Sequence, residues 1–88
     1  MVDKTFQLEI LTLNRTVFTG DVSSLIVPGA QGYVGVLANH APFLTTLMPG
    51  AITYRNPAGG TTVVASTGHG LLEVRHNHAV LLADSIAA

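Results

Sequence analysis

The segment GYVGVLANHAPFLTTLMPG, residues 32–50, restricts the fold more than any other stretch of the chain. A short apolar run at residues 34–37 leads into NHAP, residues 39–42, which predicts a turn because the residue before a proline is displaced from the α region. Residues 41–48 predict at most a turn and no helix, since prolines bracket them and two adjacent threonines are poor helix formers. Their side chains are too apolar for a solvated loop, so we expect them to pack in the core or against another chain.

Turn-forming residues recur at short intervals on both sides of this segment, among them Gly20-Asp21, Pro28-Gly29, Asn56-Pro57 and Gly59-Gly60. Short runs rich in Val, Ile, Leu, Thr and Phe lie between them. Several short strands at this spacing are typical of a β-sandwich or barrel. With 88 residues, the chain is expected to form one all-β domain spanning 1–88.

The clearest alternation of apolar and polar residues lies at residues 6–10, which predicts a strand with one buried face. Residues 24–27 are almost entirely apolar and predict a more buried strand. Two hairpins are also predicted, one joining residues 52–54 to 61–66 and the other joining 71–75 to 79–83. The side chains expected in the core are Phe6, Leu8, Ile10, Ile26, Val63 and Leu82.

Charge is scarce, because only 10% of the residues are charged where about 25% is usual. This favours either a surface rich in Thr, Ser, Asn and Gly or a large permanent protein interface. The four Lys and Arg residues are scattered and the net charge is −1, which argues against a nucleic-acid interface and an electrostatic membrane anchor. No apolar run approaches the roughly 18–20 residues of a membrane span, so direct lipid insertion is not expected.

The four histidines are potential metal ligands. His76 and His78 would share one face of a strand, but Asn77 between them indicates a turn and no third ligand is evident. We therefore expect solvated turn histidines there, and a residue at a bulge or strand junction for His69 in TGHG. No metal or other cofactor is expected.

Catalytic patterns are equally weak. Ser66, His40 and Asp84 lack the nucleophile elbow that a serine hydrolase needs, and the acids form no pair at a characteristic spacing. Gly29, Gly32 and Gly35 do not form a phosphate-binding loop. We expect no enzymatic activity from the isolated chain, and residue chemistry alone favours a turn-stabilising role for His40 over a partner contact.

Three ordered segments nevertheless resemble one family. GAQGYVGVLANHAPFLTTLMPG, residues 29–50, resembles the signature of the epsilon subunit of F-type ATP synthases, with its spaced glycines, His-Ala-Pro and closing Pro-Gly. Residues 6–29 are similar to the opening strands of that family, and residues 66–86 to its closing segment. The resemblance implies a ten-stranded β-sandwich of two roughly five-stranded sheets.

The resemblance also implies a function. It implies a non-catalytic subunit of the rotating central stalk, peripheral at the cytoplasmic face of a bacterial plasma membrane or the equivalent side of another energy-transducing membrane. Its partners would be the gamma subunit and the polar loops of the c-ring. By position, the residues that resemble a gamma-facing surface are Thr12, His40, Ala41, Pro42 and Thr45. Those that resemble a c-ring-facing loop are Pro28, Gly29, Gln31, Gly32 and Tyr33.

The chain departs from the family pattern in two places. Relatives often carry acids in the c-ring-facing loop, so hydrogen bonding and packing of Tyr33 are expected to replace a charge-paired contact. Most relatives continue beyond LADS, residues 82–85, into a helical hairpin that inhibits ATP hydrolysis and in some members binds ATP. We expect neither property from these residues. The alternatives are a stand-alone β-sandwich adaptor for another protein or a glycan, and a small metal-dependent enzyme.

Overall fold

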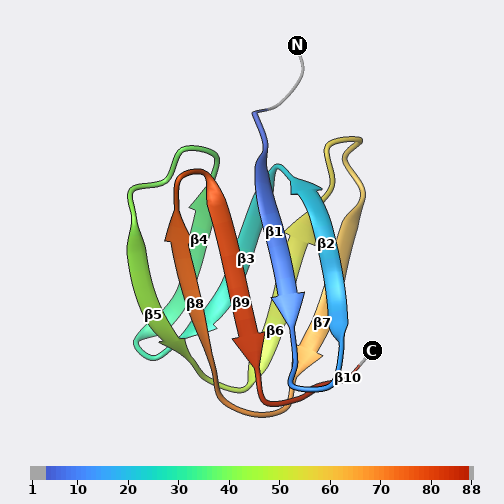
Figure 1. Ribbon diagram of the computed structural model, residues 1–88, viewed down its shortest axis with the longest axis vertical. Coiled ribbons are helices and arrows are strands. Elements are labelled where there is room, and N and C mark those ends of the chain that lie inside the picture. Colours follow the sequence, from blue (N-terminus) through green and yellow to red (C-terminus); the bar gives the residue numbers. More distant parts are fainter. Residues whose placement is uncertain (1–3, 88) are drawn as a thin grey trace.

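The computed structural model describes residues 4–87 and contains ten β-strands arranged in two layers (Figure 1). In chain order the strands are β1 (Phe6–Leu11), β2 (Thr16–Val22), β3 (Ser24–Gly29), β4 (Gly32–Leu37), β5 (Phe43–Leu47), β6 (Gly50–Arg55), β7 (Thr61–Ser66), β8 (Gly70–Arg75), β9 (His78–Ala83) and β10 (Ile86–Ala87). They form one strongly curled, hydrogen-bonded sheet in the order β10-β7-β6-β3-β5-β8-β9-β1-β2, with β4 paired to β3. The predicted all-β class is confirmed.

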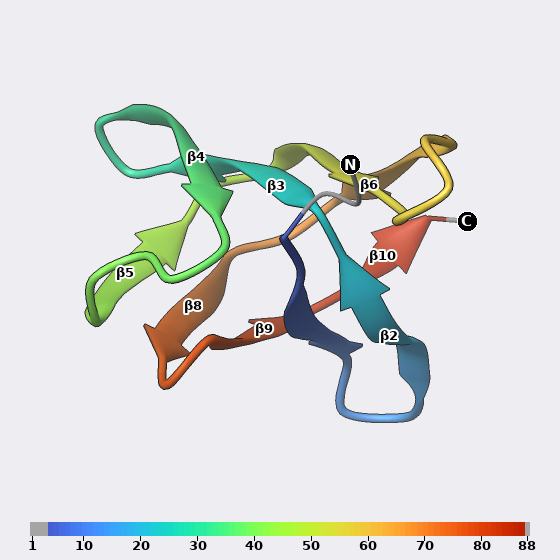
Figure 2. The ribbon, with the colours of Figure 1, turned by 90° about the horizontal axis from the view of Figure 1, so that it is seen from above.

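The curled sheet folds back on itself into two layers of five strands, as Figure 2 shows from above. One layer is β5-β8-β9-β1-β2, which we call the front layer because it faces the viewer in Figure 1, and the other is β4-β3-β6-β7-β10. The layers are joined where Gly29 of β3 pairs with Leu47 of β5. Pairing is antiparallel except between β1 and β9, which run parallel. The predicted β-sandwich is therefore confirmed, with its two five-stranded layers joined into a single curled sheet.

The core lies between the layers and is lined by one face of each strand. Phe6, Leu8 and Ile10 alternate toward it from β1, at 2%, 0% and 0% exposure, which confirms the pattern predicted for residues 6–10. The other buried apolar side chains are Val22, Leu25, Val27, Val36, Leu47, Ile52, Tyr54, Leu72, Val74, Ala79, Leu81 and Ala83. Burial of this set is the main stabilising contribution to a domain of this size.

Three residues predicted for the core lie on the outer faces instead. Ile26, Val63 and Leu82 are 45%, 60% and 43% exposed. Each lies in an uninterrupted apolar run, where the neighbouring side chains take the inward positions. A continuous apolar run does not reveal which alternate side chains face inward, because both phases look equally hydrophobic. The predictions for these three residues were wrong for that reason.

Both predicted hairpins are present, β6–β7 and β8–β9. The second turns through His76 and Asn77, whose φ angles of 52° and 58° are those of a two-residue type I′ turn. Residues 43–47 form strand β5, which residue reasoning had placed in no regular element. Residues 4–87 include no helical segment with the length and apolar character that a membrane crossing requires.

Candidate functional site

A diagonal row of leucines crosses the outer face of the front layer. Leu71, Leu82 and Leu11 occupy paired positions on the adjacent strands β8, β9 and β1. Leu44 of β5 continues the row diagonally, because its strand neighbour Thr46 pairs with Leu71. Leu44, Leu71 and Leu82 are 62%, 40% and 43% exposed, and Leu11 is half-buried. We call Leu44, Leu71, Leu82 and Leu11 the leucine stripe.

The leucine stripe connects residues that the resemblance assigned to one partner. Thr12 directly follows Leu11, and its backbone N–H donates to the Arg15 carbonyl over 2.9 Å. At the opposite end of the layer, His40, Ala41 and Pro42 form the β4–β5 connection immediately before the strand that carries Leu44. The β1–β2 turn and the β4–β5 connection lie at opposite ends of the molecule (Figure 1). The stripe runs from Leu11 beside the first of these to Leu44, which lies two residues after Pro42.

His40 is held within its own loop. Its Nδ1 atom lies 2.7 Å from the Ala41 carbonyl oxygen, and its ring packs on Phe43 with the centroids 4.8 Å apart. The His40 side chain is only partly exposed, whereas Ala41 and Pro42 are exposed. These contacts fit the turn-stabilising role, and they leave one edge of the loop open to another molecule.

Thr45 lies apart from the other four gamma-facing candidates. It pairs with buried Leu72, so its side chain points between the layers and not to the outer face. Its hydroxyl donates to the Thr46 carbonyl over 3.2 Å. Position within a motif could not reveal this direction, because the strand register decides which face a residue occupies.

Charged side chains border the leucine stripe on the same outer face. Glu73 and Glu9 flank Val80 from the neighbouring strands, and Arg75 pairs with His78. The His78 ring N–H donates to the Glu9 carboxylate over 2.7 Å, with the two side chains 44% and 35% exposed. His78 thus belongs to β9, not to the turn as predicted, and it has an acidic neighbour. The outer face of the front layer therefore carries a row of leucines toward the β1–β2 turn and, beside it, rows of charged and polar side chains toward the β8–β9 turn.

The β3–β4 hairpin carries the five residues assigned to the c-ring-facing loop. Pro28 and Gly29 are buried, whereas Gln31, Gly32 and Tyr33 are exposed. A Cβ atom at Gly29 would lie 2.9 Å from the Gly32 carbonyl oxygen, so any other residue there would force the hairpin backbone to shift. The exposed tip lies at the same end of the sandwich as Thr12 (Figure 1).

Tyr33 is exposed at its ring and anchored at its hydroxyl. The side chain is 62% exposed, and the hydroxyl accepts a hydrogen bond from the Ala51 N–H over 3.3 Å. This bond ties the hairpin to the first residues of β6 and holds the ring in one direction. The ring therefore offers a rigid, uncharged surface with little conformational entropy left to lose on contact.

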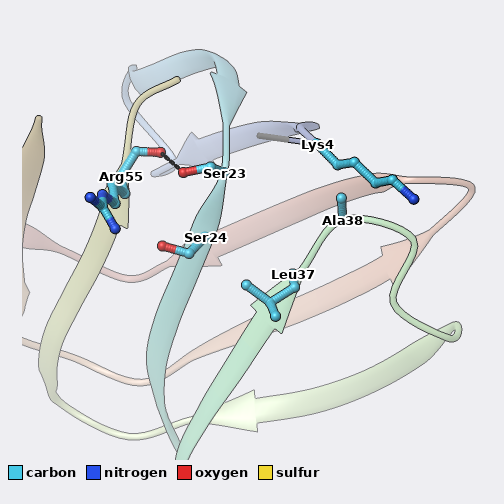
Figure 3. Close-up of a pocket in the computed structure, with 6 residues that line it drawn as sticks. All are labelled: Lys4, Ser23, Ser24, Leu37, Ala38 and Arg55. Carbon is cyan, nitrogen blue, oxygen red and sulfur yellow. Dashed lines mark hydrogen bonds between the residues drawn. The ribbon is translucent and has the colours of Figure 1, made fainter. Parts of the chain in front are cut away.

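Potential metal-binding side chains and a hollow in the surface are features of residues 4–87 that bear on binding of a metal or a small anion. No group of three metal-binding side chains lies together in this part of the chain. A hollow of about 390 Å³ is lined by Lys4, Ser23, Ser24, Leu37, Ala38 and Arg55 (Figure 3). The charged ends of Lys4 and Arg55 point away from each other, and Arg55 donates to the Gly59 carbonyl over 3.4 Å. The two cations therefore do not converge on a common anion.

The fold and these surfaces define a small β-sandwich domain whose front layer exposes a row of leucines. Residues 5–88 match the family described as "ATP synthase, Delta/Epsilon chain, beta-sandwich domain". The chain belongs to this family.

Curated relatives agree with this assignment. The ATP synthase epsilon chain of Pelotomaculum thermopropionicum is 47% identical over 85 residues, which cover 97% of this chain and 62% of the relative. That of Moorella thermoacetica is 42% identical over 78 residues, covering 89% of this chain and 58% of the relative. The chain thus spans roughly three fifths of the length of these relatives.

Two solved structures share the fold at low sequence identity. A chain of the Euglena gracilis mitochondrial ATP synthase, in a structure of OSCP, F1 and the c-ring, superposes with a TM-score of 0.89 at 16% identity. The match covers 99% of this chain and 55% of that one. A chain from the Tetrahymena thermophila mitochondrial ATP synthase central stalk and c-ring gives a TM-score of 0.81 at 12% identity, covering 99% and 69%.

Proposed function

We propose that this chain is a non-catalytic subunit of the rotating central stalk of an F-type ATP synthase, where it binds the gamma subunit and the c-ring and so couples proton transport to ATP synthesis. Family membership supports the complex, and the leucine stripe carries the assignment of the gamma-facing surface. The stripe joins the His40 loop to Thr12 across a single outer face. In such a complex the subunit is peripheral to an energy-transducing membrane and held there by its partners.

The composition of the front layer suits a permanent protein contact. A row of exposed leucines lies beside a row that contains Glu73 and Glu9, and protein interfaces usually combine apolar and polar groups in this way. Covering the exposed parts of Leu44, Leu71 and Leu82 would contribute on the order of a few kcal/mol. The border charges Glu73, Arg75 and Glu9 would fix the orientation of the partner more than its affinity.

The tip of the β3–β4 hairpin is the proposed contact with the c-ring. Gln31 and Tyr33 are exposed and uncharged there, so hydrogen bonding and ring packing replace an ion pair. Replacing Tyr33 with Ala should weaken attachment of the central stalk to the c-ring, whereas Phe should retain most of it because the ring remains. Unchanged assembly of c-ring with the Tyr33→Ala variant would remove this contact from the proposal.

Binding to the gamma subunit of the same synthase tests the function directly. The chain and that subunit are mixed, and the mass of the product is determined by size-exclusion chromatography with light scattering. We expect a 1:1 complex with the unmodified chain and its loss with Leu71→Asp, which places a charge in the centre of the stripe. Val63→Asp is the matched control, because Val63 is 60% exposed on the outer face of the other layer.

Each other outcome has a distinct meaning. A complex that survives Leu71→Asp and fails with Val63→Asp would move the gamma-facing surface to the opposite layer. If the unmodified, folded chain and the gamma subunit elute as two separate species, the proposed place in the central stalk is refuted and a stand-alone adaptor is favoured.

A further inference from the structure

The side chain of Asn77 joins two segments that are distant in the sequence. Its amide nitrogen donates to the Thr5 carbonyl oxygen over 2.8 Å. Its amide oxygen accepts from the Asn39 backbone N–H over 2.7 Å. Its own carbonyl oxygen accepts from the Gln7 N–H over 3.1 Å. One residue of the β8–β9 turn is therefore bonded to the start of β1 and to the β4–β5 connection.

The β4–β5 connection, residues 38–42, has few bonds of its own. The His40 N–H donates to the Leu37 carbonyl over a long 3.3 Å, and the His40 ring contacts the adjacent Ala41 carbonyl. Asn39 has a φ angle of 64°, and its N–H is the one that Asn77 accepts. The first contact reaches only the end of β4 that leads into the loop, and the second stays within the loop. The bond from Asn77 ties the loop to the β8–β9 turn.

We infer that Asn77 is a positioning residue, which holds the β4–β5 loop in the conformation that presents His40 to the gamma subunit. This inference rests on the function proposed above. Preorganisation of a contact loop strengthens binding because the ordering entropy is lost during folding and not on association. Asn77 would thus act on the partner without touching it, through the bond to Asn39.

The chemistry of the position explains why asparagine suits it. A φ of 58° is readily adopted by Asn, Asp and Gly and disfavoured for most other residues. Among these three, Asn alone supplies both a donor for Thr5 and an acceptor for Asn39. Aspartate keeps the acceptor for Asn39 and replaces the donor with a carboxylate oxygen that the Thr5 carbonyl repels. Glycine loses both groups, and either residue can adopt the φ angle of the turn.

Three variants separate positioning from general stability. Asn77→Gly removes both side-chain bonds, and Asn77→Asp keeps the bond to Asn39. His76→Gly is the matched control, since His76 lies in the same turn with a φ of 52° and an exposed side chain. Exchange of the His40 amide is measured by NMR on each chain alone, and affinity for the gamma subunit by calorimetry.

We expect Asn77→Gly to accelerate exchange of the His40 amide and weaken gamma binding by about fivefold to tenfold each, the range that loss of one net hydrogen bond produces. We expect Asn77→Asp to lie between the unmodified chain and Asn77→Gly in both measurements, because its carboxylate keeps the acceptor for Asn39 and repels the Thr5 carbonyl oxygen. We expect His76→Gly to change neither. Gamma binding would then follow the order of the β4–β5 loop.

The inference is overturned if Asn77→Gly exchanges and binds like the unmodified chain. It is also overturned if Asn77→Gly weakens binding without accelerating exchange of the His40 amide, because Asn77 would then act on binding by another route than ordering the loop. Failure of the unmodified chain to bind the gamma subunit would refute the proposed function and, with it, the presentation of His40. The exchange of His40 in the two Asn77 variants would still decide whether Asn77 orders the loop.

Discussion

Gly70 and Gly35 both lie inside strands, yet the space around them differs. A Cβ atom at Gly70 would overlap the Leu82 carbonyl oxygen and lie 3.1 Å from the Ala83 Cα atom. At Gly35 a Cβ atom would meet nothing within 4 Å. The close approach of β8 to β9 therefore requires that Gly70 has no side chain, whereas β4 has room for a side chain at Gly35.

This contrast predicts opposite results for the same substitution. Gly70→Ala should lower the free energy of unfolding by about 3 kcal/mol, because backbone atoms of β9 must move to admit the methyl group. Gly35→Ala should change it by less than about 0.5 kcal/mol. Urea unfolding followed by circular dichroism measures both. Equal effects would contradict the tight β8–β9 approach.

Prediction at the level of single residues was correct where a feature depends only on residues that are neighbours in the sequence. The sequence indicated a turn at His40, and the structure shows its ring bonded to the adjacent carbonyl. The sequence did not indicate the two side-chain hydrogen bonds of Asn77, because the Thr5 carbonyl and the Asn39 N–H are 72 and 38 positions away from it in the chain. Hydrogen bonds over such separations follow from the topology and leave no local pattern.

At the scale of a single element, β3 shows how the two faces of an apolar strand differ. Leu25 is fully buried, and Ile26 beside it is 45% exposed. Leu25→Ala should destabilise the domain by about 2–5 kcal/mol through lost burial and the cavity left behind. Ile26→Ala should cost less than about 1 kcal/mol, since its side chain is not enclosed. Thermal unfolding of both variants measures these losses of stability. A larger loss for Ile26→Ala than for Leu25→Ala would mean that Ile26, and not Leu25, faces the core.

The elements that the sequence predicted well are those with alternation or clear turn residues. The strand at residues 6–10 has both, and the β6–β7 and β8–β9 hairpins have distinct turns. The strand at residues 43–47 was not predicted, because its apolar and threonine residues follow neither the helical nor the strand period. The two threonines, which argue against a helix, also favour a strand. The two-residue strand β10 depends entirely on its pairing with β7.

At the scale of the whole molecule, the parallel pairing of β1 with β9 connects the two ends of the chain. Leu8 pairs with Ala79, so the first strand cannot complete its hydrogen bonding until most of the chain has folded. Sheets built on such distant pairings fold slowly, in roughly milliseconds to seconds. Stopped-flow refolding from urea should therefore resolve the main phase. A phase complete within microseconds would show that local hairpins, and not this pairing, limit folding.

The sequence by itself determined the all-β class, the two hairpins, the alternating face of the first strand and the resemblance that led to the family. These follow from local periodicity, turn chemistry and ordered motifs. Only the tertiary structure decided that Leu82 belongs to the leucine stripe on the outer face and that Thr45 points inward. The tertiary structure also decided that the Asn77 side chain is hydrogen-bonded to the loop that contains His40. The physical reason is that a β-strand side chain takes its face, and a distant hydrogen bond its partner, from the register between strands that are far apart in the chain.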